Sequence, residues 1–243
     1  MGSRNLLLAD DGRYEGASAL VVLGGEPVAE SVRHQLPPHV VVIAADSGVD
    51  QAHRLGLDVD VAIGDFDSVT EAGLDRARRR GAQISRHPVA KDATDFELAL
   101  DAAVQLGVSA AAIVGGEGGR LDHLIANALV MASPRYAALR LVAIGSDGSR
   151  LHVVRGAARL SGEPGELVTL LAVNGPATGV STDGLLYALT GATLEPGSSW
   201  GVSNRLVTDE AHVSVESGVV LAILPGPPHA AAPTLEPPHE GSE

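Results

Sequence analysis

Two carboxylates separated by one residue, Asp65 and Asp67, are the part of the sequence best suited to chemistry. They follow a short apolar run, 59–63, that ends at Gly64, so we expect them just beyond a buried strand. Residues two apart in an extended segment point the same way, so both side chains can face one ligand. Carboxylates this close repel each other unless a cation lies between them or one is protonated. The pair predicts a site for Mg²⁺, which takes carboxylate and phosphate oxygens; a solvated acidic turn is the alternative.

Other polar residues follow predicted strands in the same way. Asp46 comes directly after the apolar run 40–45, and the glycine-rich segment 115–123 comes after another apolar run. The group 91–95 follows the strand-like run 82–86 after a short loop. Ligands of an open parallel sheet bind beyond the carboxyl ends of its strands, so we expect all of these residues at one edge.

The group 91–95 also has a purely structural interpretation. Thr94 and Glu97 fit a capping box, and Asp92 and Asp95 could complement the positive end of a helix. Lys91 favours a binding role, because a cation among carboxylates suits contact with a metal-bound phosphate.

The segment 115–119 has neither the P-loop spacing nor the dinucleotide-binding fingerprint. Its glycines would let the backbone approach a ligand, with Arg120 beside them as a bidentate phosphate donor. His123 and Asn127 lie four residues apart on one helical face, next to Asp122. A histidine at such spacing is usually structural, but its place at the mouth of the helix indicates a site.

The elements that would position these residues change character near residue 150. Before it, strand-like and helix-like segments alternate, which predicts a parallel α/β sheet. From 151 to 224 the apolar runs are short and bounded by turn residues, which predicts an antiparallel β domain. We therefore divide the chain into domains 1–150 and 151–226 and a Pro/Ala/Glu-rich tail, 227–243, expected to be disordered. The predicted strands are 19–23, 40–45, 59–63, 82–86, 111–114 and 139–144, and the helices are 29–35, 49–55, 68–80 (with a capping box from Ser68 to Glu71), 94–106 and 122–132.

Composition narrows the class of partner. The net charge of −13 argues against nucleic acid, which needs a basic face, and favours a cationic small molecule or a metal-bridged anion. Without cysteine there is no disulfide, thiolate metal site or cysteine nucleophile. No run approaches the ~20 apolar residues of a membrane helix, and the first one is too short for a signal peptide. We expect a cytoplasmic protein with no membrane partner.

Six short motifs, in order, resemble those of the thiamine pyrophosphokinase (thiamine diphosphokinase) family. They are Asp46-Ser-Gly48, Gly64-Asp-Phe-Asp-Ser68, Lys91-Asp-Ala-Thr-Asp95, Gly118-Gly-Arg-Leu-Asp-His123, Gly184-Leu-Leu-Tyr-Ala-Leu189 and Gly201-Val-Ser-Asn204. Each motif is weak alone, whereas six in sequence over 19–224 are specific. The resemblance implies transfer of a pyrophosphoryl group from ATP to the hydroxyethyl oxygen of thiamine, with release of AMP. It also implies a Rossmann-like parallel α/β domain, a C-terminal antiparallel β-sandwich, and a homodimer with active sites at the subunit interface.

The resemblance assigns roles to residues of this chain. The catalytic acids would be Asp46, Asp65, Asp67 and Asp95, of which Asp65, Asp67 and Asp95 would hold Mg²⁺. ATP would be bound by Ser68, Lys91, Asp92, Thr94, Arg120, His123 and Asn127. Thiamine would be bound by Asp122, Tyr187, Ser203 and Asn204, with the ring of Tyr187 stacked on the aminopyrimidine.

Three positions depart from the family pattern or stand outside it. Leu186 stands where many members carry Lys, and Arg205 stands where an acid is frequent in bacterial members, which bears on substrate affinity. Trp200 is the only tryptophan, for which a core or interface role is expected ahead of a pocket role.

Two other functions compete with this one. An Asp-x-Asp phosphatase or transferase that forms an aspartyl phosphate would carry Thr where Val69 stands and would place the pair after its first strand. A non-catalytic nucleotide- or thiamine-binding regulator on the same scaffold would be expected to have lost its site acids. The proton acceptor stays open among Asp67, Asp95 and Asp122.

Overall fold

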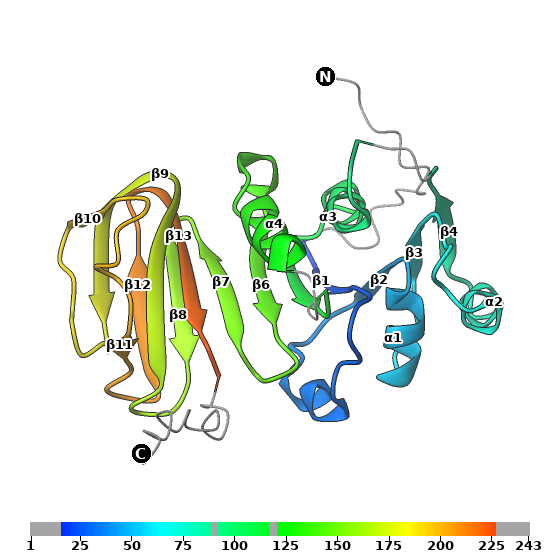
Figure 1. Ribbon diagram of the computed structural model, residues 1–243, viewed down its shortest axis with the longest axis horizontal. Coiled ribbons are helices and arrows are strands. Elements are labelled where there is room, and N and C mark those ends of the chain that lie inside the picture. Colours follow the sequence, from blue (N-terminus) through cyan, green and yellow to red (C-terminus); the bar gives the residue numbers. More distant parts are fainter. Residues whose placement is uncertain (1–15, 89–91, 117–120, 227–243) are drawn as a thin grey trace, which may run out of the picture.

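The computed structural model describes residues 16–88, 92–116 and 121–226, and Figure 1 shows them as an α/β half and a β half side by side. The predicted tail 227–243 lies outside the described residues. The strands are β1 (Ser18–Val22), β2 (Val41–Ala45), β3 (Val61–Gly64), β4 (Gln83–Arg86), β5 (Ala110–Val114), β6 (Arg140–Ile144), β7 (Arg150–Val154), β8 (Ala157–Ser161), β9 (Leu167–Asp183), β10 (Ala192–Leu194), β11 (Asn204–Arg205), β12 (Glu210–Ser214) and β13 (Ser217–Leu224). The helices are α1 (Gly48–Arg54), α2 (Glu71–Arg79), α3 (Asp95–Gln105) and α4 (Leu121–Met131), with 3-10 turns η1 (Glu30–Gln35) and η2 (Pro134–Tyr136).

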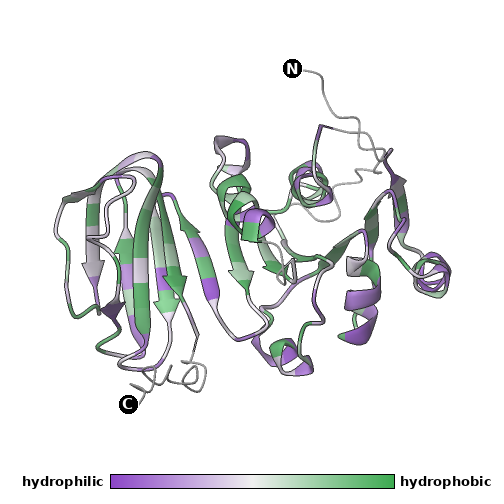
Figure 2. Ribbon diagram, viewed as in Figure 1, coloured by the Kyte–Doolittle hydropathy of each residue, from purple (hydrophilic) through white to green (hydrophobic). Residues whose placement is uncertain are grey.

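The α/β half contains the parallel sheet expected from the alternation of strands and helices. Its strand order is β4-β3-β2-β1-β5-β6, and every neighbouring pair is parallel. The strands are largely hydrophobic, whereas the exposed helix α2 is largely hydrophilic (Figure 2). Side chains of α3 pack in the core on one face of the sheet, and those of α1 and α2 pack in the core on the other. Burial on both faces explains why the strands have continuous apolar runs instead of alternation.

The sheet continues into the β half without a break. β6 pairs antiparallel with β7, β7 pairs with β13, and β13 pairs with β9. β9 is 17 residues long, and its last residues pair with β12 in a second layer that also contains β8. The side chains between the layers form a core of their own. The prediction of an antiparallel β-sandwich after the parallel α/β part is therefore confirmed.

Local chemistry corrects several predicted boundaries. The capping box from Ser68 is wrong: α2 begins after Thr70, whose Oγ1 accepts a hydrogen bond from Gly73 N at 3.1 Å. The helix expected over 29–35 is a 3-10 turn. The cap at Thr94 is present, since its Oγ1 accepts from Glu97 N at 3.2 Å. No helix in the described ranges is long and apolar enough to cross a membrane.

Candidate functional site

Three carboxylates meet beyond the carboxyl ends of β2 and β3. One oxygen each from Asp46, Asp65 and Asp67 lies within 4.8 Å of the others. Asp46 and Asp65 are partly buried and Asp67 is exposed, so the group opens to solvent on one side. Parallel pairing of β2 with β3 brings the two strand ends together, which is the convergence that strand order predicts.

Unusual backbone geometry aims these carboxylates. Asp46 and Phe66 have φ angles of 47° and 63°, a left-handed conformation that non-glycine residues seldom adopt. Gly64 has a φ of 150°, and a Cβ there would come within 3.2 Å of Asp46. The segment 65–67 is therefore a sharp turn and not the extended segment that we expected, although it still directs both acids to one place. Backbone strain of this kind is concentrated at functional sites.

Hydrogen bonds fix the acids in this arrangement before any ligand binds. Asp46 Oδ1 accepts from Phe66 N at 3.1 Å, and Ser68 Oγ donates to Asp46 Oδ2. Asp65 Oδ1 accepts from Asp67 N at 3.1 Å. Each carboxylate oxygen has a second lone pair, so the three acids still form a hard, anionic donor set that fits a divalent cation such as Mg²⁺.

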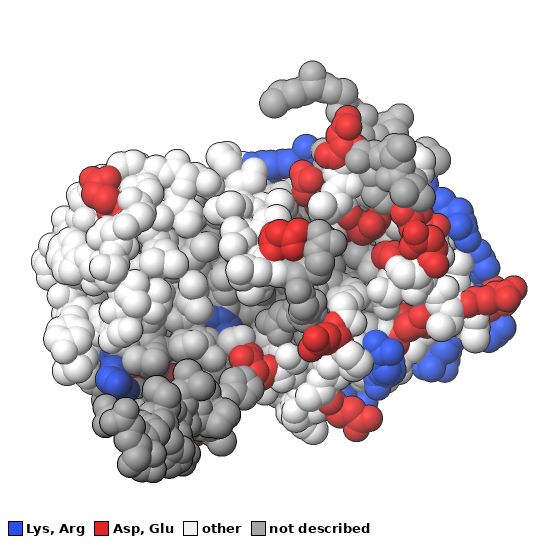
Figure 3. All heavy atoms as spheres, viewed as in Figure 1, with Lys and Arg blue, Asp and Glu red and all other residues white. Residues whose placement is uncertain are grey.

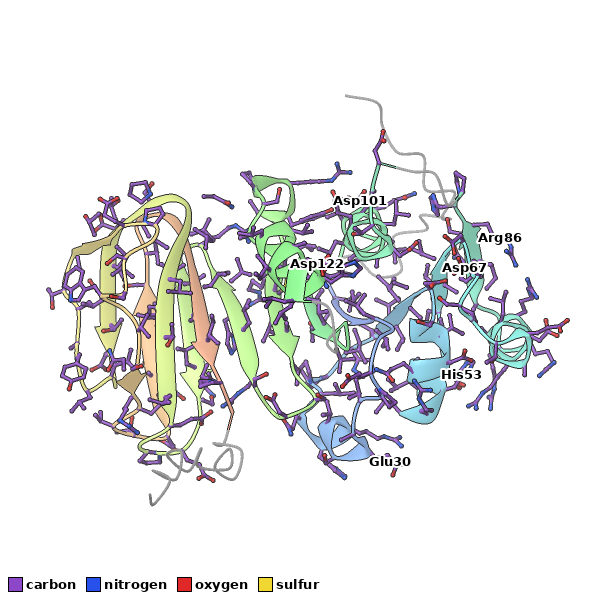
Figure 4. All side chains as sticks on the ribbon, in the orientation of Figure 1. Glu30, His53, Asp67, Arg86, Asp101 and Asp122 are labelled. Carbon is purple, nitrogen blue, oxygen red and sulfur yellow. The ribbon has the colours of Figure 1, made fainter. Side chains whose placement is uncertain are left out.

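Arg86, which our sequence reasoning missed, lies beside this turn at the end of β4 (Figure 4). Its Nη1 donates to the carbonyl oxygen of Asp65 at 3.3 Å, and its guanidinium lies 5.1 Å from the centre of the Phe66 ring. The register that pairs Gly64 with Arg86 places it there. Such a register depends on which strand lies next to β3, and no short motif reveals that.

The predicted ATP-binding residues near α3 have mixed outcomes. Asp95 is the first residue of α3 and is not part of the group of three acids, so its role as a metal ligand stays a prediction. Thr94 serves as the helix cap, and Asp92 is exposed. Lys91 and Arg120 lie outside the described residues.

Helix α4 presents the next set of predicted residues. Asp122 and His123 lie in its exposed first turn, and Figure 4 places Asp122 between the β half and the acidic turn at Asp67. Asn127 is one turn further along and faces the loop after β5: a Cβ on Gly116 would come within 3.4 Å of Asn127 Nδ2. Whether these three residues bind substrate stays a prediction.

The predicted thiamine-binding residues form a separate group in the β half. The buried Asn204 accepts from Tyr187 N at 3.0 Å through Oδ1 and donates to Tyr187 O at 2.8 Å through Nδ2, so it holds the segment that carries Tyr187. Ser203 has a φ of 62°, and its N–H donates to Thr169 Oγ1 at 3.2 Å. The side chain of Tyr187 is 66% exposed and is free to meet a ligand.

The three positions that depart from the family pattern or stand outside it, Leu186, Trp200 and Arg205, lie in this region. Trp200 is 62% exposed, so of the two expected roles the core role is wrong and the interface role stays a prediction. Arg205 donates from Nη1 to Gly165 O at 3.0 Å and lines a cavity of about 1030 Å³ with Arg150 and Glu166; Tyr187, Ser203 and Asn204 do not line it. The side chain of Arg205 is thus engaged away from Tyr187. Leu186 is 54% exposed.

The two halves of the chain match two domain models of one protein family. Residues 32–143 match the model of the thiamin pyrophosphokinase catalytic domain, and residues 152–220 match that of the thiamin pyrophosphokinase vitamin B1 binding domain. A thiamine pyrophosphokinase of Bacillus subtilis (strain 168) is 24% identical over 186 residues, which is 76% of this chain and 87% of the relative.

Solved structures share the fold. The crystal structure of thiamine pyrophosphokinase from Bacillus subtilis aligns with a TM-score of 0.75 at 22% identity, covering 87% of this chain and 100% of that one. Thiamin pyrophosphokinase from Candida albicans aligns with a TM-score of 0.67 at 15% identity, covering 86% of this chain and 88% of that one. Because the models of both domains match in tandem over most of the described residues, the chain belongs to the thiamin pyrophosphokinase family.

Proposed function

We infer that this chain is a thiamine diphosphokinase, which transfers the pyrophosphoryl group of ATP to thiamine and releases AMP. The observation that carries the inference is the group of three carboxylates at the ends of β2 and β3, in a chain that matches both family domains. We expect the reaction to take place in the cytoplasm, as the sequence suggested.

The reaction forms one bond and breaks one. The hydroxyl oxygen of thiamine bonds to the β-phosphorus of ATP, the bond from that phosphorus to the oxygen bridging to the α-phosphorus breaks, and AMP leaves with the bridging oxygen. The hydroxyl proton passes to a base. Reactions of this kind depend mainly on positioning and on neutralising charge at the phosphates. An acidic region also attracts the permanent positive charge of thiamine.

We propose that Asp46, Asp65 and Asp67 hold Mg²⁺, whereas Asp95, the first residue of α3, stays a further predicted ligand. Their preformed hydrogen bonds support this, because ligands already in place lose little freedom on binding. Bound Mg²⁺ would neutralise phosphate charge and orient the triphosphate. Hydrogen bonds from Ser68 Oγ and Phe66 N would hold the Asp46 carboxylate towards the ion, and the hydrogen bond from Arg86 to Asp65 O would stabilise the turn.

We further propose a homodimer whose active sites combine both chains. Within one chain, β11 and the Tyr187 segment paired with it lie at the far end of the β half, while β3 lies in the opposite half (Figure 1). One ligand cannot contact Tyr187 and Asp67 of the same chain across that separation. The face shown in Figure 3 supports the proposal, because charge is concentrated on the α/β half and the β half is nearly uncharged, and charged residues are depleted at the centres of interfaces.

Mixing two impaired variants, one affected in turnover and the other in its KM for thiamine, tests the shared site. We expect Asp67→Asn and Tyr187→Ala, refolded or co-expressed together, to recover about a quarter of wild-type activity at limiting thiamine, because half of the dimers would be mixed and each would have one intact site. Each variant alone serves as the control. If mixing restores nothing although light scattering shows dimers, each site belongs to a single chain.

Replacing Tyr187 by Ala is expected to raise the KM for thiamine about tenfold, since it removes the ring that would stack on the substrate. Tyr187→Phe keeps the ring and should stay close to wild type. Steady-state kinetics with thiamine and ATP varied in turn would measure this. An unchanged KM for thiamine in Tyr187→Ala contradicts the stacking role.

AMP production from ATP, with and without thiamine and Mg²⁺, tests the function itself. The diphosphokinase requires both for AMP release. Phosphate release without thiamine would instead support an Asp-x-Asp phosphatase, and binding without turnover would support a regulator.

A further inference from the structure

Helix α4 is held mainly at one end. Within one chain, residues 121–126 are all exposed, whereas Met131 and the following Ala132 are fully buried. The exposed end carries Asp122 and His123. The direction in which α4 points therefore depends on how its C-terminal end is fixed.

Two residues of the β half form hydrogen bonds with the C-terminal end of α4, an arrangement that we call the grip. Arg155, in the turn between β7 and β8, donates from Nη2 to Met131 O at 2.8 Å and to Ser133 O at 3.0 Å. Asn174, in β9, donates from Nδ2 to Ala132 O at 2.9 Å. Three successive carbonyl groups are bound in this way. The last carbonyls of a helix have no partner within it and carry partial negative charge, so a cation and an amide satisfy them.

The conformation or environment of each residue costs folding free energy, which the hydrogen bonds to the end of α4 offset. Burial lowers the pKa of Arg155, its Nε is buried without a hydrogen-bond partner, and no carboxylate of the described chain pairs with it. Asn174 has a φ of 63° and lies where the register of β9 against β13 shifts. A β-bulge of this kind redirects a side chain, here toward α4.

We propose that Arg155 and Asn174 are positioning residues, through which the β half sets the direction of α4 and presents His123 and Asn127 to the nucleotide. The inference rests on the proposed function and deepens it by naming residues far from the reacting atoms that control ATP affinity. In that arrangement the β half contributes to nucleotide binding as well as to thiamine binding.

Asn174→Gly provides the cleanest test, because glycine adopts a positive φ easily and its substitution removes the hydrogen bond without backbone strain. We expect its KM for ATP to rise about five- to tenfold, with kcat within about threefold of wild type and little change in Tm. Arg155→Met should act in the same direction more strongly, and Arg155→Lys should restore part of the loss. Hydrogen exchange of the α4 amides should accelerate in Asn174→Gly and Arg155→Met.

Arg159→Met, which removes an exposed arginine of neighbouring β8 that pairs with Glu210, is the matched control and should change none of these quantities. Unchanged ATP KM and unchanged α4 exchange in Asn174→Gly and Arg155→Met would overturn the inference, as would a loss of Tm alone. If the wild-type protein produces no AMP, the proposed function fails. Hydrogen exchange of the α4 amides then decides by itself whether Arg155 and Asn174 hold the helix in place.

Discussion

Replacing Asp67 by Asn should lower turnover by about two to three orders of magnitude, the usual effect of removing one charge-stabilising group at a reacting phosphate. Asp67 is exposed and lies in a group with two other carboxylates, so the change removes a metal ligand without opening a core cavity. We expect the circular dichroism spectrum and Tm to remain close to wild type, while Mg²⁺ affinity measured by calorimetry falls with kcat.

Asp75→Asn is the matched control for this variant. Asp75 is a half-exposed acid on α2, where it pairs with Arg78 at 2.8 Å and takes no part in the acidic group. It should retain normal turnover and Mg²⁺ affinity. Near-normal turnover in Asp67→Asn would count against the whole site assignment, because the three acids are proposed to act on one ion.

Replacing Arg135 by Met should cost on the order of 3 kcal/mol of unfolding free energy, because it removes the cationic partner of a buried carboxylate. Asp101 is 5% exposed on α3 and receives Arg135 Nε at 2.7 Å and Nη2 at 2.8 Å. Tyr136 OH also donates to Asp101, at 3.0 Å. Burial, and then the charge of Asp101, raises the pKa of Tyr136, so the phenol remains a donor. We expect a Tm lower by about 6–12 °C in a chain of this size.

The Arg78→Met variant isolates the effect of burial, since Arg78 also bonds to a carboxylate at 2.8 Å but both partners are about half exposed. Exposed pairs contribute at most about 1 kcal/mol, so its Tm should barely move. Urea unfolding at neutral pH would measure the loss of unfolding free energy in both variants. Equal losses would contradict the prediction, because burial of Asp101 would then add nothing to the effect of losing its arginine partner.

The sequence predicted the strands well because their signals are local. Continuous apolar runs ending at glycine or aspartate marked β2, β3 and β5 to within two residues, and buried parallel strands need little more. Helix starts were harder. Ser68 and Thr70 are both good caps by type, but Ser68 donates to Asp46, which follows β2, and Thr70 caps the helix.

The parallel sheet predicted that Asp46 would lie with Asp65 and Asp67, but not that Asp95 would be absent from this group, nor which residues support it. That Asp46 binds Phe66 N and that Arg86 lies over the Phe66 ring depend on the register of neighbouring strands. The same holds for the grip on α4, since nothing near Arg155 or Asn174 in the chain indicates a contact with the carbonyls of residues 131–133. Contacts between distant segments are set by packing, which single-chain patterns do not encode.

The pairing of β6 with β7 joins the two halves in one continuous sheet. Val142, Ala143 and Ile144 face His152, Leu151 and Arg150 across this ladder. Fragments produced separately on either side would each leave unpaired amide and carbonyl groups along the edge of β6 or β7. Unpaired strand edges pair with the edges of other molecules, so we expect each fragment to aggregate alone and to be soluble only when both fragments are produced together.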